Sequence, residues 1–220
     1  MHKFDTPAPI TAVLDIPAGH IRFIAADRAD TAVEVLPADA SKGRDMKVAE
    51  QTTVEYGDGV LRIEASAKNQ LLGPSGSIEV TVQLPAGSRI EAKAASAELR
   101  AVGRFGDVTF EGAHGSIRLD EAASVHLTTD AGDVEVGRLN GPAEVSIGKG
   151  DIRIAEAVRG TVVLRTQAGE ISVGAAAGVS AALDASTAYG RINNGLKNDG
   201  AAGLNIHATT AYGDIVAHSL

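Results

Sequence analysis

The sequence predicts an all-β protein, a single-domain parallel β-solenoid with less regular N-terminal coils. A tripeptide of glycine, a polar or charged residue, and isoleucine or valine occurs seven times, beginning at positions 106, 115, 132, 150, 169, 190 and 213. Most intervals between copies also contain a second run in which apolar and polar residues alternate, such as Val145/Ile147. Alternation with a period of two is typical of strands, and self-similarity at a nearly fixed step is typical of repeat architectures.

Composition favours a narrow, layered core. The chain has 220 residues, of which 44% are hydrophobic, but only 3% are aromatic and tryptophan is absent. Valine, isoleucine, leucine and alanine must therefore fill the interior, and one all-β domain of this length is ordinary. We expect one domain over residues 1–220, with irregular coils and a hairpin in 1–96 and the regular array in 97–220.

The N-terminal part contains several strand signals. Residues 10–36 predict two strands around the turn Pro17-Ala18-Gly19, and the same three residues recur at 85–87, where they predict an equivalent turn. The polar stretch 37–51 predicts a loop or one short helix from Asp45. Thr53–Tyr56 and Val60–Ala65 flank Gly57-Asp58-Gly59, which predicts a hairpin. The segment Asn69–Gly76 is expected to be an exposed loop, and the apolar alternation from Ile78 to Leu84 predicts the next strand.

In the array, alternate residues define an inward and an outward face. Glu135, Arg153 and Ser172 are expected to face outward. Successive coils should stack at about 4.8 Å and wind right-handed, and each could hold two strands or three shorter faces. The expected inward ladder is Val108/Phe110, Ile117/Leu119, Val134/Val136, Ile152/Ile154 and Ile171/Val173.

The end of the array carries its own expectation. Residues 193–203 are rich in glycine and asparagine and predict an inserted loop. The sequence stops five residues after Ile215. We therefore expect the rung of Ile215 to be the last of the stack, with an open edge.

Polar residues recur at fixed positions of the repeat. Asp107, Asp133, Asp151 and Asp214 follow the repeat glycine, and each is expected to cap its own turn backbone. A calcium ladder is the alternative, but other residues replace the aspartate in three copies, so we expect no metal site. The threonines three places before the glycine are expected to bond a turn amide; a flat threonine ladder that binds an ordered surface is the alternative. These threonines are Thr129, Thr166, Thr187 and Thr210.

Tyr189 and Tyr212 precede equivalent glycines and are expected to form a stacked pair at one edge. Either the two rings pack the turn, or they form an interaction site. The six histidines show no metal-binding spacing.

No catalytic motif is found, so we expect no enzyme activity, no catalytic residues and no cofactor. A carboxylate cleft is the remaining enzymatic possibility; we expect Asp133 and Glu135 on opposite faces of a strand, which argues against it. The net charge is −8, and residues 105–220 hold 8 basic and 14 acidic side chains. This excess argues against nucleic acid and favours a neutral or basic protein partner. Without an apolar leader, a membrane-spanning run or a cysteine, the chain is expected to be cytoplasmic and not to bind membranes.

The turn Leu-Pro-Ala-Gly at 84–87, the run Ala-Ser-Ala-Glu-Leu at 95–99 and the Gly-Asp-Ile/Val units resemble a bacterial family of domains of unknown function, described as putative adhesins with β-strand repeats. A looser similarity is to bactofilins, β-solenoids that polymerise end to end. The resemblance implies a non-enzymatic scaffold or protein-interaction module. The alternatives are a self-assembling polymer that associates through a terminal coil, and a carbohydrate- or metal-binding β-helix.

Overall fold

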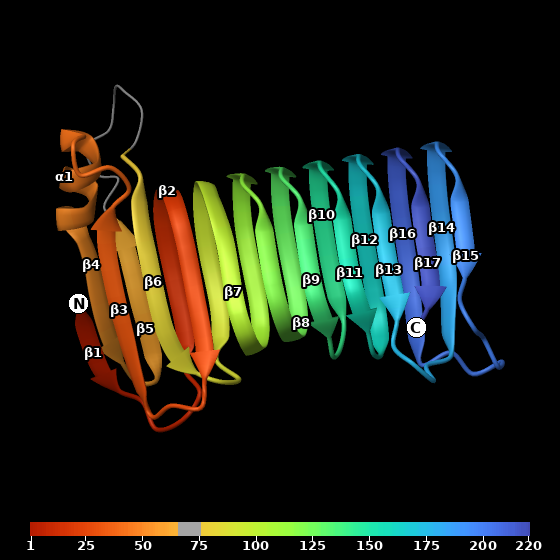
Figure 1. Cartoon of the computed structure of the whole chain (residues 1–220), viewed down its shortest axis with the longest axis horizontal. Helices are drawn as coiled ribbons and strands as arrows, with labels where there is room; N and C mark the ends of the chain where they lie inside the picture. The colour runs from red at the N-terminus through yellow and green to blue at the C-terminus, as the bar shows by residue number, and fades with distance from the viewer. Residues whose placement is uncertain (66–75) are drawn as a thin grey trace. The chain divides into compact units, whose positions relative to one another are not determined.

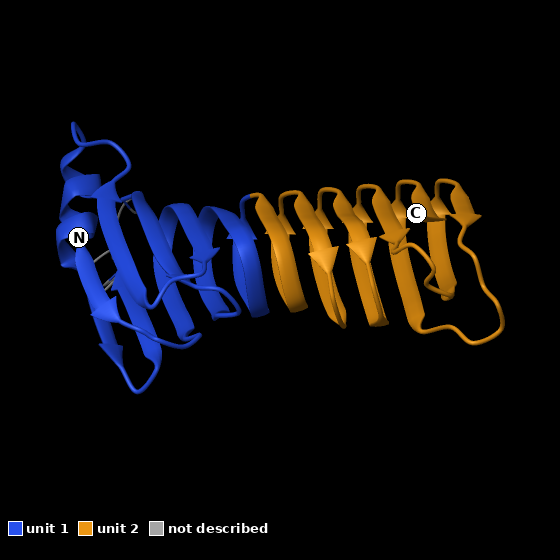
Figure 2. Ribbon diagram, turned by 60° about the horizontal axis from the view of Figure 1, so that its bottom comes forward, with its two compact units in different colours: residues 1–115 blue, residues 116–220 orange. Residues whose placement is uncertain are grey.

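The computed structural model describes residues 1–65 and 76–220 and confirms an all-β, solenoid-like fold. The loop expected at Asn69–Gly76 lies, except for Gly76, outside the described residues. The chain divides into two compact units, residues 1–115 and 116–220 (Figure 2). Among the described residues, no helix is long and apolar enough to cross a bilayer.

Residues 116–220 form a stack of parallel coils with two strands each (Figure 1). One layer holds the first half of β8 with β9, β11, β13, β17 and β15, and the other holds the second half of β8 with β10, β12, β16 and β14. Two strands per coil, rather than three faces, is therefore the arrangement in this unit. The bounds are β8 (Ile117–Ala131), β9 (Val134–Leu139), β10 (Ala143–Lys149), β11 (Ile152–Ala157), β12 (Gly160–Ala168), β13 (Ile171–Ala175), β14 (Ala181–Tyr189), β15 (Ile192–Gly195), β16 (Leu204–Tyr212) and β17 (Ile215–Ser219).

The core lies between these two layers. In the first layer Val134 pairs with Ile152, which pairs with Ile171, so that like residues stack directly on one another. Every residue of the expected inward ladder is at most 2% exposed, which confirms the assigned face. Burying a branched aliphatic side chain stabilises by about 1.5–3 kcal/mol, so the ladder supplies much of the stability of the array.

The last two coils occupy the stack in reversed order, which corrects the expectation that the rung of Ile215 is the final one. β16 lies between β12 and β14, and β17 lies between β13 and β15. The chain thus skips one position after β13, and the final coil returns to fill it. The core positions of the two coils differ in composition. β17 places Ile215 and Ala217 there, each 1% exposed, whereas β15 places Ile192 and the polar Asn194 at the equivalent, exposed positions, which suits the outermost coil.

The repeat glycine is required by this close stacking. At Gly213 the φ angle is +147°, and an added Cβ would lie 2.0 Å from the carbonyl oxygen of Gly169 on the adjacent coil. Only glycine avoids both the contact and the unfavourable φ.

Unit 1 is built around two long strands. The strand β2 pairs in parallel with β7, and β2 also pairs with β5 through its first part and with β6 through its second. The bounds are β1 (His2–Asp5), β2 (Thr11–Ala26), β3 (Asp30–Pro37), α1 (Gly43–Gln51), β4 (Thr52–Gly57), β5 (Val60–Ala65), β6 (Ile78–Pro85) and β7 (Arg89–His114).

The two Pro-Ala-Gly segments are not equivalent, contrary to expectation. Residues 85–87 form the turn between β6 and β7, but Pro17-Ala18-Gly19 lies inside the continuous strand β2. In the stack, Pro85 lies beside Ala26 rather than beside Pro17. Gly19, at φ +144°, lets β2 pass against Ile78, whose carbonyl oxygen would be 1.8 Å from an added Cβ. The glycine therefore permits a close approach between strands instead of ending one.

One end of unit 1 is closed by antiparallel strands. β3 pairs with β1 and β6, and β4 pairs with β5 in the expected hairpin, where Asp58 and Gly59 have φ angles of 51° and 76°. The rings of Phe4 and Tyr56 lie 5.4 Å apart. The stretch 37–51 contains the helix α1, which begins at Gly43 and buries Val48.

Candidate functional site

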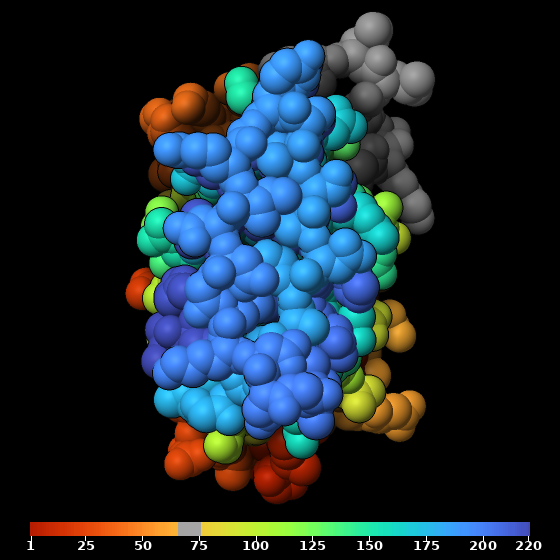
Figure 3. Space-filling view, turned by 90° about the vertical axis from the view of Figure 1, so that its right-hand side faces the viewer, coloured from red at the N-terminus to blue at the C-terminus, as the bar shows by residue number. Residues whose placement is uncertain are grey.

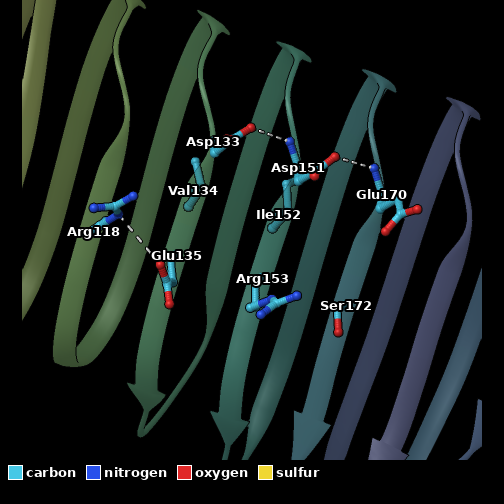
Figure 4. Close-up of a pocket in the computed structure, with 9 residues that line it drawn as sticks. All are labelled: Arg118, Asp133, Val134, Glu135, Asp151, Ile152, Arg153, Glu170 and Ser172. Carbon is cyan, nitrogen blue, oxygen red and sulfur yellow. Dashed lines mark hydrogen bonds and ion pairs between the residues drawn. The ribbon is translucent and has the colours of Figure 1, made fainter.

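A shallow hollow lies on the outer side of the first layer of unit 2, over β8, β9, β11 and β13 (Figure 4). Its volume is about 180 Å³. Because the lining residues come from equivalent positions of successive coils, their side chains form rows across the strands. The lining residues are Arg118, Asp133, Val134, Glu135, Asp151, Ile152, Arg153, Glu170 and Ser172.

The aspartates of the hollow bind backbone amides of the next coil. The Oδ1 atom of Asp133 accepts the N–H of Asp151 at 2.9 Å, and the Oδ1 atom of Asp151 accepts the N–H of Glu170 at 2.8 Å (Figure 4). Asp214 accepts the N–H of Arg191 in the same way at 2.8 Å. For these three aspartates, the expectation that each caps its own turn is therefore wrong in its partner, because coil stacking places a neighbouring amide within reach.

The second row of the hollow alternates in charge. Glu135 lies between Arg118 and Arg153 in the register, and its Oε2 atom is 3.6 Å from the Nε atom of Arg118. Asp133 and Glu135 line the same outer face, which corrects the expectation of opposite faces: residues two apart on a strand share a face. Within the described part of the chain, the guanidinium of Arg153 forms no ion pair or hydrogen bond.

The threonines of the repeat are structural. The Oγ1 atom of Thr166 donates to the carbonyl oxygen of Gly150 at 3.2 Å, that of Thr210 to Gly169 at 3.1 Å, and that of Thr187 to Gly213 at 3.0 Å. The expected hydrogen bond to a turn amide is therefore wrong in its partner: each of these hydroxyls donates to a backbone carbonyl oxygen of the adjacent coil. Because Thr129, Thr166 and Thr210 are buried, they offer no flat surface to a ligand.

Tyr189 and Tyr212 form the expected stacked pair. Their ring centroids are 5.0 Å apart with an interplanar angle of 2°, and the side chains are 68% and 60% exposed. β14 and β16 place the rings side by side because Tyr189 and Tyr212 are register partners. The pair thus presents aromatic surface to solvent, and its role as an interaction site stays a prediction.

The other polar candidates lie apart from one another. Asp107 lies in unit 1, where its Oδ2 atom is 3.3 Å from Nε of Arg89. Three histidines each face a carboxylate of an adjacent strand: His20 faces Glu98, His126 faces Glu144 and His207 faces Asp184, at 3.3, 3.7 and 3.4 Å. Among the described residues, no three histidine, aspartate or glutamate side chains gather as metal ligands.

Two ion pairs that the sequence analysis did not predict form because the strand register places their side chains side by side. The guanidinium of Arg191 donates to Oδ2 of Asp214 at 2.7 Å and, with the backbone hydrogen bond, holds the pKa of Asp214 below its usual range. In unit 1, Lys93 lies 2.9 Å from Glu111, whose hydrogen bond and charge raise the pKa of the lysine. Neither pair could be found before the stacking partners were known.

The chain resembles a solved structure described as a putative adhesin from Bacteroides fragilis, with a TM-score of 0.60 and 12% identity over 98% of this chain and 95% of that one. It also resembles one described as a putative lipid binding protein from Parabacteroides distasonis, with a TM-score of 0.50 and 14% identity over 97% and 95% of the two chains. At these identities the likeness shows the fold alone.

No curated protein matches the sequence. The family model Toastrack DUF4097 matches residues 13–219, nearly the whole described array and the coils before it. This match confirms the resemblance to bacterial β-repeat domains described as putative adhesins. The chain therefore belongs to the Toastrack DUF4097 family.

Proposed function

We propose that the chain is a non-enzymatic, adhesin-like interaction module that binds a protein partner across the hollow of unit 2. The observation that carries the proposal is the exposed guanidinium of Arg153, which lies in the middle of the hollow and pairs with no other described side chain. Its neighbour Arg118 is already paired with Glu135. Arginine is enriched at the centres of protein interfaces because its planar fork makes several hydrogen bonds at once.

The chemistry of the hollow favours binding over catalysis. A general acid or base must direct a free carboxyl group at its substrate. Of the four carboxylates of the hollow, Asp133 and Asp151 accept backbone amides and Glu135 is paired with Arg118. This leaves Glu170 without a second unengaged carboxyl group for a paired acid–base role. The volume of about 180 Å³ is also below the roughly 300 Å³ at which small-molecule pockets begin. A broad protein contact suits such a surface better than an enclosed substrate.

The charge of the surface limits the partner. Two arginines and four carboxylates line the hollow, and residues 105–220 are acidic overall. We therefore expect a neutral or basic protein surface that carries one carboxylate or exposed carbonyl group to receive Arg153.

Photo-crosslinking tests this proposal in cells that make the protein. A photoreactive amino acid replaces Ser172, which lines the hollow, and in a control protein it replaces Thr209, which is exposed on β16 in the other layer. We expect a discrete adduct from position 172 only. Arg153→Ala should reduce this adduct about tenfold, and Arg165→Ala, on the other layer, should leave it unchanged. Equal adducts from both positions, no adduct, or insensitivity to Arg153→Ala would contradict the proposal.

A further inference from the structure

The outermost coil of unit 2, formed by β14 and β15, has an uncovered side. Among the described residues, the register gives β14 one neighbour, β16, and gives β15 one neighbour, β17. The loop after β15 reaches the first residue of β14, where the N–H of Ala181 donates to the carbonyl oxygen of Lys197 at 2.9 Å. Figure 3 looks onto this end, where residues of this coil and its loop form the surface.

Core positions of this coil are incompletely buried. Ile192 is 47% exposed, whereas its register partner Ile215 is 1% exposed. Leu183 and Ala185 on β14 are half-buried, and their partners on β16 are buried. An open strand edge flanked by exposed apolar side chains is a template for pairing with another chain.

We propose that a second copy of this chain covers the outer edge of β14 and forms a closed, two-fold symmetric dimer. In an antiparallel pair centred on Ala185, Leu183 of one copy lies opposite Thr187 of the other. A large apolar residue then meets a smaller one, and Asp184 faces Ser186 instead of a second carboxylate. The strand is thus self-complementary in size and charge, as a two-fold interface requires.

Charge favours this end for self-association. Of the two charged side chains of the coil, Arg191 binds Asp214 within the same chain, and Asp184 lies 3.4 Å from the Nδ1 atom of His207, which forms an ion pair with it when the imidazole is protonated. Docking a copy here therefore buries no unpaired arginine, and in the proposed register the hydroxyl of Ser186 of the other copy can donate a hydrogen bond to Asp184. The outer faces of the array belong to a segment with a net charge of −6 and would repel each other.

The antiparallel edge strands of unit 1 favour a closed dimer over a polymer. A head-to-tail polymer needs a second open end that accepts β14. In unit 1, the antiparallel strands β1 and β4 form the end of the sheet; Phe4 lies against Tyr56, and α1 packs on β3. Short edge strands are a common means of limiting edge-to-edge association, and β1 and β4 have only 4 and 6 residues.

Sedimentation of the intact chain over a range of protein concentrations tests the inference, together with two variants. We expect a monomer–dimer equilibrium. Ile192→Lys should raise the dimer dissociation constant at least about tenfold, because each copy brings one lysine to the symmetric interface. Leu36→Lys is the matched control, since Leu36 is 45% exposed but lies in unit 1. Its dissociation constant should equal that of the wild type.

Cysteine crosslinking tests the register, because the native chain has no cysteine. Ala185→Cys places two thiols across the symmetry axis, at a Cα separation of about 4.5–5.5 Å, and should yield a disulfide-linked dimer on mild oxidation. Ala182→Cys on the same strand places them roughly 20 Å apart and should not. A strictly monomeric wild type, growth beyond dimers, or equal crosslinking at 182 and 185 would overturn the inference. So would an Ile192→Lys protein that dimerises like the wild type. Because this surface is separate from the hollow, none of these outcomes bears on the proposed partner site.

Discussion

Replacing Gly213 by alanine tests whether close coil stacking is the reason for the repeat glycine. The added Cβ would lie 2.0 Å from the carbonyl oxygen of Gly169 and 2.6 Å from its carbonyl carbon, so the adjacent coil must move away. Overpacking of this kind costs about 1–3 kcal/mol, and an alanine at positive φ costs about 1–2 kcal/mol. We expect the free energy of unfolding to fall by roughly 2–5 kcal/mol.

Gly178→Ala is the matched control for this substitution. Gly178 also has a positive φ, +78°, but an added Cβ there meets no atom within 4 Å. It should show the cost of alanine at a left-handed φ without any steric contact, and both variants share the same change in unfolded-chain entropy. Urea unfolding followed by circular dichroism gives both values. If Gly213→Ala loses no more stability than Gly178→Ala, contact between coils does not explain the glycine.

Three further substitutions test the core, the threonines and one ion pair. Ile152→Asp buries an unpaired charge and should cost several kcal/mol; a thermal melt like that of the wild type would disprove the inward ladder. Thr166→Val removes a buried hydrogen bond and should lower the free energy of unfolding in urea by about 1 kcal/mol. An unchanged free energy would show that the Thr166 hydroxyl does not stabilise the stack. Hydrogen bonds from Arg28, and then Lys3, lower the pKa of Asp30 to about 2. Its stabilisation is therefore full above the usual pKa of 3.8 and is lost as the pH falls toward 2; Asp30→Asn should flatten the stability profile only in this range, and an unchanged profile would contradict the assignment.

The inward ladder could be predicted because period-two alternation leaves little freedom. Shifting Ile152 by one residue would expose it and bury Arg153, so the sequence admits one choice of face. The hairpin around Asp58 could be predicted for a similar local reason, since its turn residues tolerate positive φ. Both features depend on residues close together in the chain.

The spatial order of the last coils could not be predicted from spacing. Parallel coils of equal pattern can stack on either neighbour, and residues 196–203 are long enough to let the chain return. One signal was available in retrospect: Asn194 occupies a core position, opposite Ala217. A polar residue there suits an outermost coil better than an internal one.

The hydrogen-bond partners of the polar side chains were predicted wrongly, again because the stacking of the coils decides them. The repeat placed Asp133 and Thr166 correctly along the chain, but their partners belong to other coils. The distance between coils, not the distance along the sequence, decides which amide or carbonyl is nearest. The row around Arg153 likewise becomes a surface only when the coils are stacked.

The composition of the outermost coil bears on how strongly it associates. A fully apolar open coil would recruit further chains without limit, whereas a fully polar one would recruit none. This coil retains Leu183 and Ile192 but carries Thr187 and Asn194 at other core positions. We therefore expect a reversible dimer whose strength depends on the two apolar residues. Ile192→Lys should weaken the dimer while leaving the monomer's stability nearly unchanged, because the side chain is already half exposed. Gly213→Ala disturbs the contact with Gly169, which lies one coil further in, and should lower the stability of the monomer itself.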